Sequence, residues 1–71
     1  MTALNAALLD AHARQDRAAL VQLYQQAAAL VSGPERSFFL TQAYVFALES
    51  GHSDTRALRA ALIDMGCEAP A

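Results

Sequence analysis

A chain of 71 residues has room for one small domain, and a domain of this size leaves a large share of its surface in contact with water. Apolar residues make up 55% and charged residues 17% of the composition, which excludes an intrinsically disordered chain. A net charge of −2 with only five lysines and arginines provides no basic stripe for phosphate groups, so nucleic-acid binding is not expected.

The composition also indicates the fold class and the compartment. Alanine is abundant and no stretch alternates apolar and polar residues as a strand does, so we expect an all-α domain spanning residues 1–71. No apolar run is long enough to span a bilayer, and the N-terminus lacks the basic region of a signal peptide. The single cysteine, Cys67, cannot form an internal disulfide. We therefore expect a cytoplasmic protein without membrane contact.

The first half of the chain predicts two helices. The first runs from Thr2 to about Ala13, with Thr2 available as its N-cap. The apolar pattern breaks between Arg14 and Arg17, where Asp16 can cap a new helix; a tight corner and one continuous helix both fit this segment. The second helix runs from about Arg17 to Val31.

A helix break is predicted at Ser32-Gly33-Pro34-Glu35. Gly33 can adopt the left-handed conformation that ends a helix, and Pro34 suits the first turn of the next one. Ser32 and Glu35 have the spacing of a capping box. These signals separate the second helix from the third.

The third predicted helix, from Glu35 to Glu49, contains all three phenylalanines and is the centre of the domain. With about 100° per residue, its broad inward side consists of apolar residues: Phe39, Leu40, Ala43, Phe46 and Ala47. Phe38 and Val45 fall instead on the polar side, next to Gln42 and Glu49. A small domain should not leave two such side chains exposed without a function.

The remaining residues predict a fourth helix and a tail. The third helix stops at Ser50-Gly51, and Ser53 or Asp54 caps a helix that ends at Gly66. Its expected inward residues are Leu58, Ala61, Leu62 and Met65, and its expected outward residues are Arg56 and Arg59. Residues 67–71 have little apolar content, so we expect them to fray.

The two halves of the chain repeat one pattern. A helix and a polar corner lead into D16-R-A-A-L20 in one half and into D54-T-R-A-L58 in the other. Between Ala43 and Leu62, aromatic and small residues precede a glycine turn and an alanine-rich helix, whereas Gln15 stands at the glycine position of the first half. These features resemble tetratricopeptide repeats, which stack helical hairpins side by side.

The resemblance implies four helices arranged as two antiparallel hairpins, either stacked as in those repeats or closed into a small four-helix bundle. In such repeats the first helix of each hairpin lines the binding groove, which implies that Gln42, Val45 and Glu49 lie near a partner peptide. Two repeats alone leave an open apolar flank, so the resemblance also implies self-association or a protein partner, unless the chain closes into the bundle.

Polar residues that could support catalysis occur in two groups. They are His12 with Asp16, and Glu49 with His52 and Asp54. Neither group has paired metal-ligand spacing, so we interpret both as solvated helix ends, and we expect no metal and no cofactor. Cys67 has no activating neighbour, and no phosphate-binding loop or nucleophile motif occurs. Enzymatic activity is not expected.

The sequence therefore predicts a non-enzymatic protein-interaction module, an adaptor or a self-associating homo-oligomer, that uses an apolar strip on the third helix. The expected partner-binding residues are Phe38, Gln42, Val45 and Glu49. For Phe38 and Val45, burial beneath a neighbouring loop is the alternative. A second hypothesis is a small regulatory or ligand-binding bundle with an internal pocket near Tyr24 and Tyr44.

Overall fold

The computed structural model describes residues 3–66, and in this range the chain forms four helices and no strand. The helices are α1 (Ala3–Ala13), α2 (Arg17–Ala29), α3 (Gly33–Ser50) and α4 (Thr55–Asp64). The all-α prediction is confirmed. The predicted N-cap Thr2 and the predicted frayed tail, residues 67–71, lie outside the described residues.

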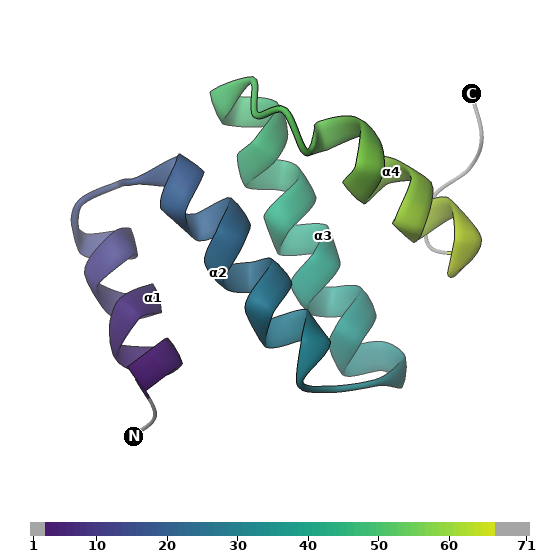
Figure 1. The fold of residues 1–71 in the computed structure, drawn as a ribbon, viewed down its shortest axis with the longest axis horizontal. Helices are drawn as coiled ribbons and strands as arrows, with labels where there is room; N and C mark the ends of the chain where they lie inside the picture. Colours follow the sequence, from purple (N-terminus) through teal and green to yellow (C-terminus); the bar gives the residue numbers. More distant parts are fainter. Residues whose placement is uncertain (1–2, 67–71) are drawn as a thin grey trace.

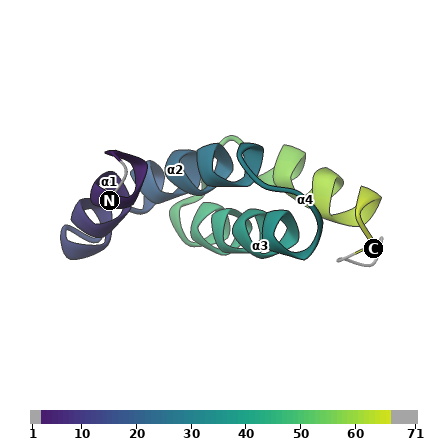
Figure 2. The same ribbon diagram turned by 90° about the horizontal axis from the view of Figure 1, so that it is seen from below.

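The chain reverses direction at each of its three connections, so neighbouring helices run antiparallel (Figure 1). Both predicted pairs, α1 with α2 and α3 with α4, are in contact, but the largest interface joins α2 to α3. Figure 2 shows α2 and α4 on the same side of α3. The molecule is correspondingly flat, measuring 34 × 26 × 13 Å. Among the described helices, none therefore covers the opposite side of α3.

A tight corner, and not a continuous helix, joins α1 to α2. Gln15 adopts a left-handed conformation with φ of 54°, which turns the chain. Asp16 then caps α2, because its side chain accepts a hydrogen bond from the Ala19 N–H at 3.1 Å. The predicted role of Asp16 is confirmed.

The connection from α2 to α3 follows the sequence signals in part. α2 ends at Ala29, earlier than predicted, and Gly33 is left-handed with φ of 63°. Pro34 lies in the first turn of α3, as predicted. Ser32 occupies the N-cap position, but its side chain makes no capping hydrogen bond, so the predicted capping box is wrong. The extended backbone of Ser32 and the proline start the helix without it.

α3 ends as predicted, at Gly51, whose left-handed conformation lets its N–H bond to the Ala47 carbonyl. The start of α4 differs from the prediction. Asp54 is at the N-cap position, but its carboxylate makes no cap hydrogen bond. It accepts hydrogen bonds instead from the side chains of Gln25 at 3.1 Å and Gln22 at 3.4 Å. Asp54 therefore links α4 to α2.

The core lies on the inner side of α3, where α2 and α4 each pack against it. Its buried members are Val21, Ala28, Leu40, Ala43, Ala47, Leu58 and Leu62. Ala43 and Ala47 are fully buried and one turn apart, so their small side chains let both neighbouring helices approach the α3 backbone. Phe39 and Phe46, predicted as core, are half-buried and pack against this cluster.

Two side chains of the fourth helical segment lie differently from the prediction. Met65, expected among the inward residues, is the C-cap residue of α4 and remains 37% exposed. Arg59, expected to point outward, is half-buried, whereas Arg56 is exposed as predicted. Within residues 3–66, none of the helices has the length and apolar character needed to cross a membrane.

Candidate interaction surface

The outer side of α3 carries the exposed apolar residues that the sequence singled out. Phe38 is 57% exposed and Val45 is 41% exposed. Both lie opposite the buried Leu40, Ala43 and Ala47 of the same helix. No loop among residues 3–66 covers either side chain to the point of burial, so burial beneath a neighbouring loop is wrong.

Leu48 extends this exposed row, with an exposure of 55%. Leu48 was not among the predicted partner-binding residues, although its position three residues after Val45 places it on the same helical stripe. Exposed Thr41 fills the remaining position between Phe38 and Val45. We call Phe38, Thr41, Val45 and Leu48 the outer strip.

The outer strip is anchored at one end to a group of aromatic rings. Phe38 contacts Phe39 edge to face, with ring centroids 5.6 Å apart. The ring centroid of Phe39 in turn lies 6.1 Å from that of Tyr24 in α2. Such ring pairs favour a particular side-chain arrangement, so Phe38 is exposed but packed against a neighbouring ring on one side.

The two polar residues predicted beside the strip have different environments. Gln42 is half-buried, and no partner for its amide is found in the part of the chain that the structure describes. Glu49 forms an ion pair with Arg17 at the start of α2, in which Nε of Arg17 donates a hydrogen bond to Oε2 of Glu49 over 2.8 Å. Glu49 is therefore held at the edge of the strip by a cation.

Tyr24 and Tyr44, the residues of the alternative pocket hypothesis, are both half-buried and pack against the core. Tyr24 stacks on Phe46 with ring centroids 5.9 Å apart, and its hydroxyl lies 2.8 Å from Nε2 of His12. The ring of His12 also meets Phe46 edge to face at 5.8 Å. These contacts tie α1 to both α2 and α3.

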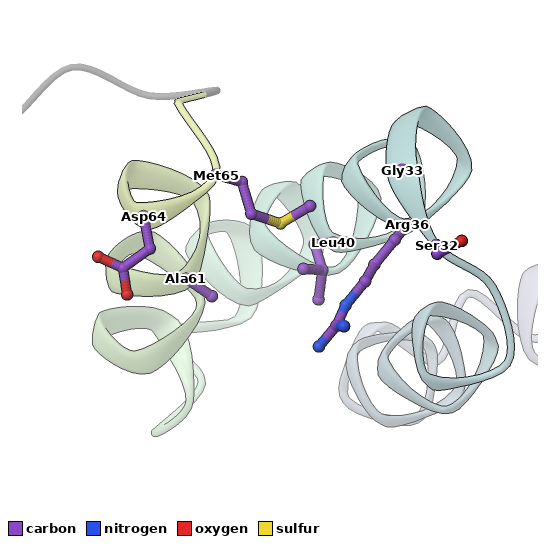
Figure 3. Close-up of a pocket in the computed structure, with 7 residues that line it drawn as sticks. All are labelled: Ser32, Gly33, Arg36, Leu40, Ala61, Asp64 and Met65. Carbon is purple, nitrogen blue, oxygen red and sulfur yellow. The ribbon is translucent and has the colours of Figure 1, made fainter.

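Two of the hollows on the surface formed by residues 3–66 are well defined, and neither of these is lined by Tyr24 or Tyr44. The larger, of about 380 Å³, lies between the start of α3 and the end of α4 (Figure 3), and its lining residues are Ser32, Gly33, Arg36, Leu40, Ala61, Asp64 and Met65. In Figure 3, Met65 reaches toward Leu40, while the Asp64 carboxylate turns away from Arg36. The smaller, of about 170 Å³, is lined by His12, Gln15, Arg17, Leu20, Phe46 and Glu49. The internal pocket near the two tyrosines stays an untested hypothesis.

The polar groups considered for catalysis have structural roles. Asp16 caps α2, and His12 bonds to Tyr24. Nδ1 of His52 accepts a hydrogen bond from the Asp54 N–H at 3.0 Å, which shapes the corner before α4. Residues 3–66 contain no group of three histidine, cysteine, aspartate or glutamate side chains placed to hold a metal ion. Cys67 lies outside this range.

Comparison with known proteins identifies no relative of this chain. No family model matches the chain, and no curated protein and no solved structure is similar to it at the level searched.

Proposed function

We propose that this protein is a non-enzymatic protein-interaction module that binds through the outer strip of α3. The observation that carries the proposal is the exposure of Phe38, Val45 and Leu48 in one row on the helix that forms the centre of the core. Fully burying a side chain of this size contributes about 1.5–3 kcal/mol, so three of them give a partner a substantial gain. A rigid helix also presents them without loss of backbone freedom on binding.

The surroundings of the strip have the composition of an interface. An apolar centre is bordered by polar groups, namely Gln42 on one side and the Arg17–Glu49 ion pair at one end. Gln42 offers both hydrogen-bond donors and an acceptor to a partner. We propose that these groups fix the orientation of the bound chain, while the outer strip provides most of the binding free energy.

The repeated sequence pattern supports a further part of the proposal, a relationship to tetratricopeptide-like helical repeats. The two matching segments that begin at Asp16 and Asp54 lead into α2 and α4, which lie on the same side of α3 (Figure 2). The proposed place of action is the cytoplasm, as an adaptor or a self-associating domain.

Capture from an extract of the source cells tests the proposal. The wild-type chain, Phe38→Asp and Leu9→Asp serve as baits; Leu9 on α1 is a matched control because it is also 57% exposed but lies off the strip. We expect Phe38→Asp to lose the captured proteins, including any second copy of the chain, and Leu9→Asp to keep them. Equal capture by all three baits, with all three folded by circular dichroism, contradicts the proposal.

A further inference from the structure

The outer strip has a spacing that is unchanged when it is read backwards. Its residues, at positions 38, 41, 45 and 48, follow one another at intervals of three, four and three, the spacing of one face of a coiled coil. We propose that α3 pairs with α3 of a second copy, antiparallel, about a twofold axis at the level of Ala43. This inference rests on the proposed function and names its partner.

In this pairing, each residue of the strip meets a different one from the other copy. Phe38 lies opposite Leu48 at both ends, and Thr41 lies opposite Val45 next to the axis. The larger side chains therefore fill the outer layers, and the smaller ones let the two helices approach at the centre. An isologous interface of this kind needs only one surface patch, and both copies supply it.

Thr41 can be buried in this interface without losing a hydrogen bond. Its Oγ1 already donates to the Ser37 carbonyl of the same helix at 2.8 Å. A buried hydroxyl is costly only when it has no partner, so the central layer carries no such penalty. The methyl group of Thr41 remains available to contact Val45 of the other copy.

Charge complementarity favours a second copy as the partner. The antiparallel arrangement brings Glu35 of one copy to the level of Glu49 of the other, and two carboxylates alone would repel each other. Arg17 prevents this, because its contact with Glu49 joins Nε to Oε2 and leaves the terminal guanidinium nitrogens outside that contact. Glu35 has no ion pair or hydrogen bond within residues 3–66, so each Arg17 gains a second carboxylate.

The polar edge near the axis is also self-complementary. Gln42 lies on the same edge as Glu35 and Glu49, one turn from Phe38, and meets its own copy across the twofold axis. A side-chain amide both donates and accepts, so two facing glutamines can satisfy each other. The half-buried amide of Gln42 thereby gains the partner that residues 3–66 do not supply.

The size of the contact sets the strength of the dimer. From Phe38 to Leu48 the strip extends about 15 Å along the helix axis. A stable dimer buries about 800 Å² on each copy, which requires the flanks of α3 as well as the strip. We therefore expect a dissociation constant in the micromolar range, on the order of 1–100 μM.

Sedimentation equilibrium tests the pairing directly. We expect the mass of the full chain to rise from one copy to two between about 1 μM and 1 mM. Val45→Glu should hold the chain as a monomer, and Leu9→Glu should not. Circular dichroism checks that each variant is folded.

Cross-linking tests the orientation of the two helices. In a Cys67→Ala background, Gln42→Cys should be joined to its own copy by a short bismaleimide, because this position lies near the axis. Glu35→Cys should not be joined, since its two copies lie about 24 Å apart along the helices. A parallel pair would cross-link at both positions.

Several results overturn this pairing, and they differ from those that overturn the proposed function. A monomer at every concentration, a dimer that persists in Val45→Glu, or cross-linking through Glu35→Cys each contradicts it. A monomer that captures a different protein in a Phe38-dependent way contradicts the pairing alone and leaves the proposed function intact. If no association of any kind depends on Phe38, both the pairing and the proposed function are contradicted.

Discussion

Arg17, the first residue of α2, forms an ion pair with Glu49 in the last turn of α3, with 2.8 Å between Nε and Oε2. The pair lies at one end of the largest helix interface and at the edge of the outer strip. Its position relates it both to the stability of the monomer and to the surface that we propose binds a partner.

The contribution of this pair to monomer stability should be small. Both side chains are about half exposed, at 49% and 47%, so water and salt screen the attraction. A double-mutant cycle with Arg17→Ala and Glu49→Ala should give a coupling free energy below about 1 kcal/mol. Urea unfolding at low and high salt measures it. A coupling of several kcal/mol that does not change with salt would show that the pair is part of the core.

The contact of α3 with its neighbours depends on small side chains. Ala43 is fully buried between α2 and α4, so Ala43→Leu should force these helices apart and lower the free energy of unfolding by about 1–3 kcal/mol. Ala57→Leu on the exposed side of α4 is the matched control and should change it by less than about 0.5 kcal/mol. Denaturant unfolding of both variants checks the prediction, which fails if the two behave alike.

Gln15 is a non-glycine residue in a left-handed conformation, with φ of 54°. Such a conformation costs about 1–2 kcal/mol for a residue with a side chain. Gln15→Gly removes this cost but makes the unfolded chain more flexible, so we expect a net gain of about 0.5–1 kcal/mol. In contrast, Gln26→Gly within α2 should lower stability by about 1 kcal/mol. Thermal unfolding of the two variants compares them, and a destabilised Gln15→Gly would contradict this interpretation of the corner.

Asp54 links the start of α4 to α2 through hydrogen bonds from Gln22 and Gln25. Asp54→Ala removes both and should lower the free energy of unfolding by about 1–2 kcal/mol. Asp64→Ala, at the exposed end of α4, is the control and should have little effect. If the carboxylate acted only as a helix cap, Gln25→Ala would lower the free energy of unfolding by the same amount in the Asp54→Ala background as in the wild type. We expect it to cost less.

The sequence predicts the helices well because their signals are local. Asp16, Pro34 and Gly51 determine where helices begin and end through contacts with residues a few positions away. The exposure of Phe38 and Val45 also follows from helical spacing within one element. Leu48 obeys the same spacing, and extending the row by three residues would have found it.

Other features depend on contacts between distant residues and could not be predicted in this way. The spacing of Asp54 indicates a cap, but Gln22 and Gln25 are more than twenty-five residues away in sequence and compete for its carboxylate. The partner of Glu49 is Arg17, which only the packing of α2 on α3 brings within reach. The helical pattern also does not say which helix packs on the buried Ala43 and Ala47, so it could not predict that the largest interface joins α2 to α3.

The central claim, that the outer strip serves association and not the monomer core, is tested most directly by measuring Phe38→Asp in two ways on the same preparation. Denaturant unfolding at a concentration where the wild type is monomeric should give a free energy of unfolding within about 1 kcal/mol of the wild-type value, because Phe38 is 57% exposed. Light scattering at high concentration, or binding to a captured partner, should show that association is lost. A variant that unfolds outright, or that loses more than about 3 kcal/mol as a monomer, would place Phe38 in the core and contradict the account.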